Sequence, residues 1–168
     1  MKLPSTELRI MTSDDWSDVA RIYAEGLETG NATFQQTVPS WNEWNNGHIQ
    51  SCRLVATVDG IVAGWAALSA VSSRPVYAGV AEVSVYIGKD FRGIRIGDQL
   101  MKSLIEESEK EGFWTLQSSI FPENQASVHL HEKYGFRIMG YRKKVGKMNG
   151  IWRDTMIMER RSKIVGID

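Results

Sequence analysis

The stretch that decides the fold is VAEVSVYIGKDFRGIRIGDQLMKSLIEESEKEG, residues 80–112. In its first part, 80–88, Val83, Val85 and Ile87 share one side and the residues between them face the other, as in a β-strand. Its later part, 98–111, places apolar residues three and four apart before Gly112, which indicates an amphipathic helix with a glycine stop. A strand that turns directly into a helix is therefore the centre of the fold.

The turn between them, residues 92–98, reads RGIRIGD. The start of a helix offers unpaired N–H groups and a partial positive charge, and glycines let the backbone approach phosphate oxygens closely. This turn can therefore cradle a pyrophosphate, although an ordinary connection between a strand and a helix has the same composition. It is not a Walker A loop, because no Gly-Lys-Ser/Thr follows, and its glycine spacing is not that of a dinucleotide-binding fingerprint.

The chain on either side of this unit alternates between strands and helices. Capping boxes at Thr12 and Ser40 predict two helix starts, and Asp59-Gly60 predicts a tight hairpin. A further helix is expected over 124–134. The other expected strands are 7–11, 54–58, 61–70, 113–121, 138–144 and 152–160. This order predicts an α/β or α+β fold with a mixed sheet.

The composition is that of one ordinary globular domain over residues 1–168. Twenty basic and twenty acidic side chains give a net charge of zero, which argues against a nucleic-acid partner bound through an overall basic field. We find neither an apolar run long enough to cross a membrane nor the apolar stretch of a signal peptide. A cytoplasmic protein without a membrane partner is the expectation.

Metal and hydrolase chemistry have little support in the sequence. Cys52 is the only cysteine, which predicts a small core residue rather than a ligand. His129 and His131 point apart on a helix, and His48 is the only other histidine, so no metal site is expected. No Gly-x-Ser-x-Gly motif is present, so a serine hydrolase has no support either.

Read with its surroundings, the turn resembles motif A of the GNAT superfamily of N-acetyltransferases, Gln/Arg-x-x-Gly-x-Gly/Ala. Arg92 and Gly97 match the ends of that motif, whereas Arg95 stands where the family usually has glycine. Arg95 costs about 1 kcal/mol or more if the backbone there needs a positive φ. Asn124 and the run HEKYGF, residues 131–136, resemble the second half of the family pattern.

Within that superfamily the chain is most similar to the phosphinothricin acetyltransferase group, over about residues 7–160. The matching segments are 22–34, 73–77, 80–86, 129–136 and 150–154. The resemblance implies the GNAT fold, a mixed and mostly antiparallel sheet flanked by helices. It implies transfer of an acetyl group from acetyl-CoA to the α-amine of a small amino acid such as phosphinothricin or methionine sulfoximine or sulfone. It also implies a homodimer.

The resemblance also implies roles for individual residues. Glu82 is the candidate base for the amine, and His131 the candidate proton donor to the leaving thiolate. Either residue also has an ordinary interpretation, as a solvated strand glutamate and a half-buried helix histidine. The acceptor pocket is implied to contain Phe34, Arg74 and Tyr77, with Arg74 binding a carboxylate or phosphinate unless it is a solvated loop charge. The implied coenzyme-binding residues are Val85, Tyr86, Ile87, Arg92, Gly93, Ile94, Arg95, Ile96, Gly97, Asp98 and Asn124.

Two alternatives stay open at this point. The first is an acetyltransferase for another amine, such as a protein N-terminus, a polyamine or an aminoglycoside. The second is a sensor that binds acyl-CoA on the same fold without turnover, because fold does not fix function. Arg95, which stands in place of the usual glycine, favours the sensor, whereas the presence of Glu82 argues against it.

Overall fold

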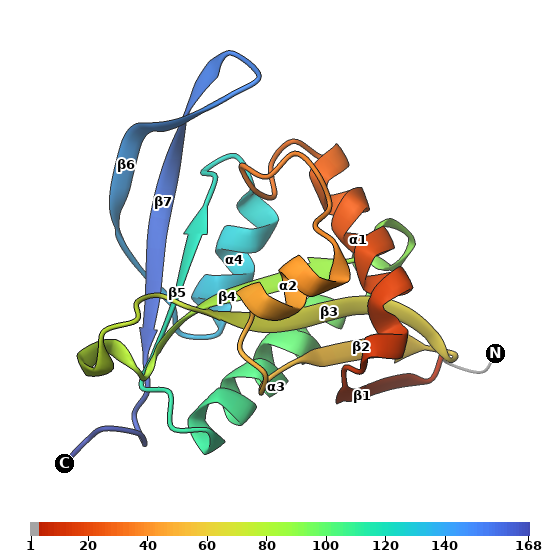
Figure 1. Cartoon of the computed structure of the whole chain (residues 1–168), viewed down its shortest axis with the longest axis horizontal. Helices are drawn as coiled ribbons and strands as arrows, with labels where there is room; N and C mark the ends of the chain where they lie inside the picture. The colour runs from red at the N-terminus through yellow and green to blue at the C-terminus, as the bar shows by residue number, and fades with distance from the viewer. Residues whose placement is uncertain (1–3) are drawn as a thin grey trace.

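The computed structural model describes residues 4–168, which form a seven-stranded sheet with helices on both faces (Figure 1). The strand order is β1-β2-β3-β4-β5-β7-β6. Every neighbouring pair is antiparallel except β4 and β5, which are parallel and joined through helix α3. The order of elements predicted a mixed sheet and the family resemblance implied a mostly antiparallel one, and both expectations are confirmed.

The elements follow the expected order closely. The strands are β1 (Thr6–Ile10), β2 (Leu54–Val58), β3 (Ile61–Ala70), β4 (Val80–Ile87), β5 (Thr115–Ile120), β6 (Arg137–Met148) and β7 (Ile151–Arg161). The α-helices are α1 (Trp16–Glu28), α2 (Trp41–Gly47), α3 (Ile96–Lys110) and α4 (Gln125–Lys133). Short 3-10 turns are η1 (Ser13–Asp15), η2 (Pro75–Tyr77) and η3 (Lys89–Phe91). Among the described residues, no helix is long and apolar enough to span a membrane.

Local sequence signals set most of the boundaries. Asp59 and Gly60 have φ values of 48° and 83°, the pair of positive angles that a two-residue hairpin turn needs. Ser40 accepts a hydrogen bond from the Glu43 amide at 3.2 Å, and the Glu43 carboxylate accepts one from the Ser40 amide at 2.8 Å, so α2 begins with the expected capping box. Cys52 is buried in the core as predicted.

Several boundaries differ from the expectation; β5, for example, begins at Thr115 rather than at residue 113, and two other differences involve a residue with a positive φ. Helix α3 starts at Ile96 rather than at residue 98, because Arg95 adopts a left-handed conformation that turns the chain into the helix at once. Strand β6 continues to Met148 rather than ending near 144. Its register with β7 is interrupted after Arg142, near the positive φ of Lys144, but pairing resumes at Gly146. A bulge of this kind re-aims side chains without ending the strand.

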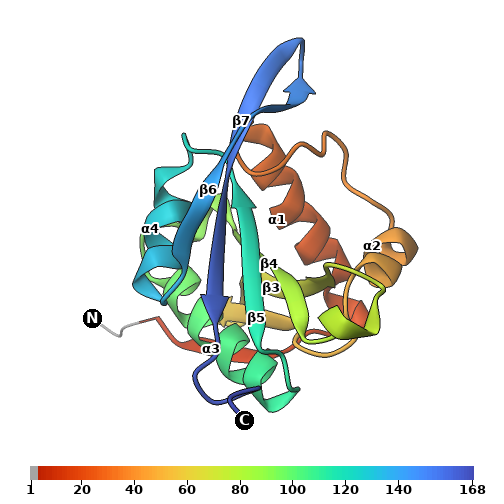
Figure 2. The same ribbon diagram turned by 90° about the vertical axis from the view of Figure 1, so that its left-hand side faces the viewer.

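The sheet separates two apolar clusters. Helices α3 and α4 lie on one side of it, and α1 and α2 on the other (Figure 2). On one face, α3 and its neighbours pack on residues such as Leu68 and Val83. On the other face, α1 and α2 cover a cluster rich in aromatic rings, centred on the fully buried Trp65. Because side chains alternate along a strand, burying Val83 on the α3 face places Glu82 on the α1 face.

Candidate active site

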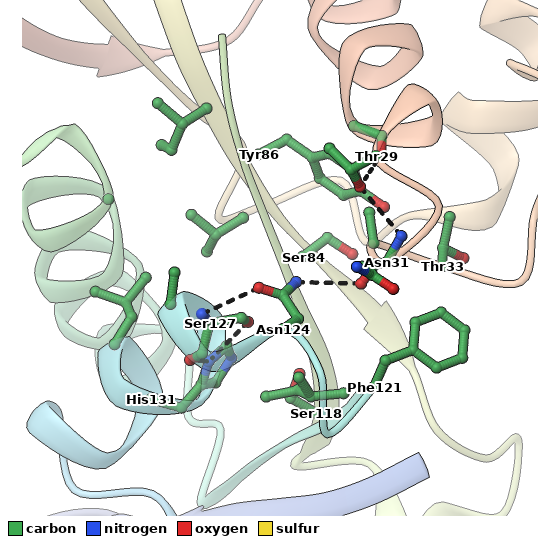
Figure 3. Close-up of a pocket in the computed structure, with 18 of the residues that line it drawn as sticks. Thr29, Asn31, Thr33, Ser84, Tyr86, Ser118, Phe121, Asn124, Ser127 and His131 are labelled. Atoms are coloured by element: carbon green, nitrogen blue, oxygen red, sulfur yellow. Dashed lines mark hydrogen bonds between the residues drawn. The ribbon is translucent and has the colours of Figure 1, made fainter. Parts of the chain in front are cut away.

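A cavity of about 1290 Å³ opens where the sheet spreads apart. Its walls come from the later part of β4, the start of α3, the end of β5, helix α4 and the loop after α1 (Figure 3). Most of the residues expected from the sequence line it. They are Phe34, Glu82, Val85, Tyr86, Ile87, Arg92, Gly93, Arg95, Ile96, Gly97, Asp98, Asn124 and His131.

The cavity exists because β4 and β5 separate after a short parallel pairing. Their parallel pairing covers Val80–Glu82 on β4 and Thr115–Gln117 on β5. Beyond Glu82, β4 continues to Ile87 while it still pairs with β3 on its other edge. The β4 edge that faces the cavity therefore presents backbone N–H and C=O groups, which can bind an extended amide chain as an added strand would.

The turn before α3 forms one end of the cavity. Gly93 and Arg95 have φ values of 79° and 67°, which fold the turn back over the start of the helix. Arg95 therefore has the positive φ for which the sequence analysis expected an energetic cost, because a residue with a side chain is strained in this conformation. Arg92 and Arg95 are both exposed and both line the cavity beside the N-terminus of α3, whose partial positive charge adds to theirs. Ile94, expected among these residues, is 48% exposed and does not line the cavity.

Asp98 in the first turn of α3 is already engaged by α4 and its C-terminal cap. It accepts hydrogen bonds from the Lys133 ammonium and, at 3.1 Å, from the Tyr134 hydroxyl. The Lys133 hydrogen bond lowers the pKa of the Asp98 carboxyl. This pairing offsets the one negative charge at the helix N-terminus, so an anion can approach the backbone amides.

Asn124 joins two segments of the site (Figure 3). Its side-chain oxygen accepts a hydrogen bond from the Ser127 amide at 3.3 Å, which confirms the predicted cap of α4. Its side-chain nitrogen donates to the backbone oxygen of Asn31, in the loop after α1, at 3.2 Å. Asn124 therefore holds the α1 loop against the start of α4.

His131 is 4% exposed and lies on the inner side of α4. Its Nδ1 is 2.6 Å from the backbone oxygen of Ser127, so Nδ1 carries the proton and donates it to that carbonyl. The other nitrogen, Nε2, then presents a lone pair and is buried without a partner among the described residues. Burial lowers the pKa of the imidazole, which keeps it neutral. A neutral ring with its proton on Nδ1 presents a hydrogen-bond acceptor at Nε2.

Glu82 sits at the point where β4 and β5 separate. It pairs in register with Ser69 on one side and Gln117 on the other, and it is half-buried with its side chain on the cavity lining. Glu82 is the last β4 residue paired with β5, so its carboxylate lies where the unpaired edge of β4 begins.

Aromatic stacking fixes the rest of β4. The rings of Tyr86, Tyr23 and Trp65 pack together as a cluster of three, with Tyr86 centred 5.0 Å from Tyr23 and 4.8 Å from Trp65, and those two 5.9 Å from each other. A Cβ atom at Gly26 of α1 would lie 2.7 Å from the Tyr86 ring, so only glycine fits there. Burial raises the pKa of the Tyr86 hydroxyl well above its usual value. The tyrosine therefore acts as an uncharged spacer between α1 and β4.

The opposite end of the cavity is built from residues far apart in sequence. Phe34 meets Phe121 edge to face, with ring centroids 4.9 Å apart, and Gly146 of β6 packs so closely that a Cβ there would lie 2.7 Å from the Phe34 ring. Arg153 of β7 places its guanidinium 3.9 Å from the centre of the Phe121 ring. It also donates to Gly30 O at 2.9 Å and Asn31 Oδ1 at 2.8 Å, which ties the α1 loop to the sheet.

Two residues expected at the acceptor end lie elsewhere. Arg74 and Tyr77 belong to the η2 turn, where the guanidinium lies 5.6 Å from the tyrosine ring. Both side chains are exposed and neither lines the cavity of this chain. The turn precedes β4, at the end of that strand remote from the open edge.

Sequence reasoning gave no role to three residues at this end, Arg142, Arg153 and Thr155. Arg142 and Thr155 line the cavity, and Arg153 supports it. The Asn149-Gly150 hairpin and strand alternation already placed Arg153 and Thr155 on one face of β7. No signal in the sequence indicates that this face of β7 meets the cavity.

Comparisons with known proteins agree with this geometry. The profile of the Acetyltransferase (GNAT) family matches residues 16–136. A phosphinothricin N-acetyltransferase from Alcaligenes faecalis is 32% identical over 159 residues, 91% of this chain and 81% of that protein.

Solved structures with the same architecture include a phosphinothricin acetyltransferase from Sinorhizobium meliloti in complex with acetyl-CoA. It is 30% identical with a TM-score of 0.86, over 97% of this chain and 91% of that one. A ribosomal-protein-alanine N-acetyltransferase from Brucella melitensis is also 30% identical, with a TM-score of 0.84 over 93% of this chain and 99% of that one. The two structural relatives carry different acceptor names at equal identity, so overall similarity does not choose the acceptor.

Proposed function

The chain belongs to the GNAT family of acetyl-CoA-dependent N-acetyltransferases, and on that premise we propose that its acceptor is the α-amine of a small amino acid of the phosphinothricin type. The observation that carries the proposal is the cavity itself. It joins an open strand edge and an amide-rich turn to a compact pocket walled by Phe34 and Phe121, with Glu82 lining the same space.

The coenzyme end fits acetyl-CoA. We assign the pantetheine arm, an extended chain with two amides, to the open edge of β4 at Val85, Tyr86 and Ile87. The pyrophosphate is assigned to the turn from Arg92 to Asp98, where backbone amides and the Arg92 and Arg95 side chains meet. When bound there, acetyl-CoA supplies the activated acetyl group.

We assign the proton chemistry to Glu82. An amino acid arrives with a protonated amine, which cannot attack a thioester until it loses that proton. The Glu82 carboxylate lines the cavity where β4 and β5 separate, and it accepts this first proton directly or through a water. The amine then forms the amide bond as the C–S bond of the thioester breaks, and the departing thiolate takes the second amine proton, directly or through a water. Most of the rate enhancement would come from holding the amine beside the carbonyl, with backbone amides polarising the carbonyl oxygen.

We propose that His131 stays neutral during turnover and accepts a hydrogen bond at Nε2. The bond from Nδ1 to the Ser127 carbonyl supports this tautomer, and the burial that lowers the imidazole pKa opposes a protonated ring. This role differs from the proton donor expected from the family resemblance.

A homodimer is part of the proposal. The β6–β7 hairpin extends beyond the body of the protein (Figure 1) and exposes apolar side chains that suit a second copy. They are Ile138, Met139, Tyr141, Ile151 and Trp152. Light scattering during size-exclusion chromatography tests this; a monomer at micromolar concentration would contradict it.

The experiment that tests the function measures free-thiol release from acetyl-CoA with a panel of amines. The panel contains phosphinothricin, methionine sulfoximine, methionine sulfone, polyamines, an aminoglycoside and a peptide with an N-terminal alanine. We expect turnover on the first three. Turnover on the peptide alone would keep the family chemistry and reject the amino-acid acceptor. Binding of acetyl-CoA by calorimetry, with no thiol release from any amine, would favour the sensor.

A further inference from the structure

The acceptor end of the cavity contains a cation and a hydroxyl that lack partners. Arg142 of β6 lines the cavity, and among residues 4–168 its guanidinium has no hydrogen-bond or ion-pair partner. Thr155 of β7 also lines the cavity and is 5% exposed, and its Oγ1 is buried with no partner among the same residues. A buried hydroxyl without a partner is unfavourable, so its presence on a cavity wall points to a ligand that supplies one.

The two residues face each other across the hairpin. Arg142 and Thr155 are register partners on neighbouring antiparallel strands, so their side chains leave the same face of the sheet. Directly opposite residues have Cβ atoms about 5 Å apart. A single small group can therefore contact both side chains.

That face also carries Glu82. Glu82 pairs with Gln117, which pairs with Glu159, and Glu159 shares a face with Thr155 because the two are four residues apart on β7. At ~3.3 Å per residue, Thr155 lies about 13 Å along β7 from the row that contains Glu82. Because β7 also lies two strand spacings, about 10 Å, to the side of β4, the long side chains of Glu82 and Arg142 span only part of the separation. Both side chains line the same cavity, where a small molecule with polar groups at opposite ends can bridge the remainder.

We propose that Arg142 and Thr155 form an oxyanion-binding subsite that selects acceptors bearing a phosphinate or carboxylate at the end remote from the reacting amine. The inference rests on the proposed transfer to a small amino acid. The guanidinium binds the oxyanion through paired N–H donors, and the Thr155 hydroxyl donates to one of its oxygens. The subsite takes over the recognition that the sequence analysis gave to Arg74, which lies outside the cavity of this chain.

Three substrates separate the remote oxyanion from the α-carboxylate. Phosphinothricin carries both, methionine carries only the α-carboxylate, and 3-aminopropyl(methyl)phosphinate carries only the remote group. Steady-state kinetics with each should be measured for wild type, Arg142→Met and Thr155→Val. Lys143→Met is the matched control, because it removes an exposed charge from the neighbouring position on β6 and does not line the cavity.

For Arg142→Met we expect the KM of phosphinothricin and of the aminophosphinate to rise roughly 10-fold or more, the scale of one lost charge-assisted contact. For Thr155→Val the expected rise is about 3-fold, and Thr155→Ser, which keeps the hydroxyl, should restore it. The KM of methionine and of acetyl-CoA should stay within about 2-fold in each variant, since neither uses the subsite. An equal loss on methionine and phosphinothricin, or no loss on either, would overturn the subsite.

Direct binding keeps the test independent of the proposed function. Calorimetry with methylphosphonate, on protein saturated with CoA so that the phosphate-binding turn is filled, measures the subsite whether or not any amino acid is acetylated. We expect a Kd roughly 10-fold weaker in Arg142→Met than in wild type. If no amino acid is acetylated but this difference is seen, the proposed function fails and the subsite stands. Equal binding to both proteins, or no binding to wild type, would overturn the subsite.

Discussion

The two ends of the cavity are built in different ways. The proposed coenzyme end is a nearly continuous stretch, β4 and the turn into α3, and it offers largely backbone groups. The acceptor end brings together side chains that are far apart in sequence; Arg153, for example, binds Gly30 across 123 residues. The residues of a site built from one contiguous stretch of backbone can be predicted from the sequence and assigned by comparison with relatives. A site assembled from distant side chains depends on packing, so it can differ between relatives of equal identity.

The largest expected effect is at the junction of the two ends. Glu82→Gln keeps the shape of the side chain and removes the base, so we expect turnover to fall by roughly 10² to 10⁴. Acetyl-CoA affinity should not change, because Glu82 lies below the open edge of β4. Thiol release and calorimetry measure the two quantities, with the exposed Glu106→Gln as the control. An unchanged turnover would remove Glu82 from the mechanism.

Arg153→Met tests the acceptor end alone. The change removes two hydrogen bonds to the α1 loop and the contact with Phe121, so we expect a stability loss of about 1.5–3 kcal/mol in urea unfolding. The acceptor KM should rise roughly 10-fold, while the acetyl-CoA KM rises by less. Arg137→Met, which breaks an exposed ion pair with Glu159 on the same hairpin, should cost less than about 1 kcal/mol. Equal rises in both KM values would show that the two ends are not separable.

The pH dependence of stability tests the buried state of His131 between the two ends. Burial lowers its folded pKa, so the unfolded chain binds the proton more readily. Its contribution to stability is complete above the unfolded pKa of about 6.5 and is lost progressively as the pH falls from that value toward the lower folded pKa. The slope for one histidine is at most about 1.4 kcal/mol per pH unit.

Urea unfolding of wild type and His131→Asn from pH 7.5 to pH 5 measures this slope. His48, whose pKa is also lowered by burial, contributes in both proteins, so the difference between them isolates His131. The exposed His129→Gln is the control and should follow wild type. Identical slopes for wild type and His131→Asn would contradict a buried neutral imidazole.

The smallest expected effect is at the coenzyme end. Arg95 has a φ of 67°, a conformation that glycine adopts without strain, so Arg95→Gly should stabilise the protein by about 1 kcal/mol. If the guanidinium pairs with a coenzyme phosphate, the same change raises the KM of acetyl-CoA. Thermal unfolding and steady-state kinetics measure the two effects. A lower melting temperature would show that the Arg95 side chain stabilises the turn.

Much of the fold was predictable because its signals are local. Turn residues such as Asp59 and Gly60, capping boxes, and alternation along β4 each depend on neighbours within a few residues. Where prediction fell short, at the start of α3 and the end of β6, the cause was a non-glycine residue with a positive φ, Arg95 or Lys144. No composition rule assigns that conformation to a cationic side chain.

The sequence by itself determined the order of elements, the family pattern and the coenzyme end, because these depend on local conformation and on contiguous backbone groups. Only the tertiary structure decided the acceptor end. It set Arg74 outside the cavity and brought Arg142 and Thr155 to its wall. It also fixed the tautomer of His131 through the Ser127 carbonyl. The physical reason is that a side chain's partners, burial and charge are set by which strand faces pack together, and that packing joins residues more than a hundred positions apart.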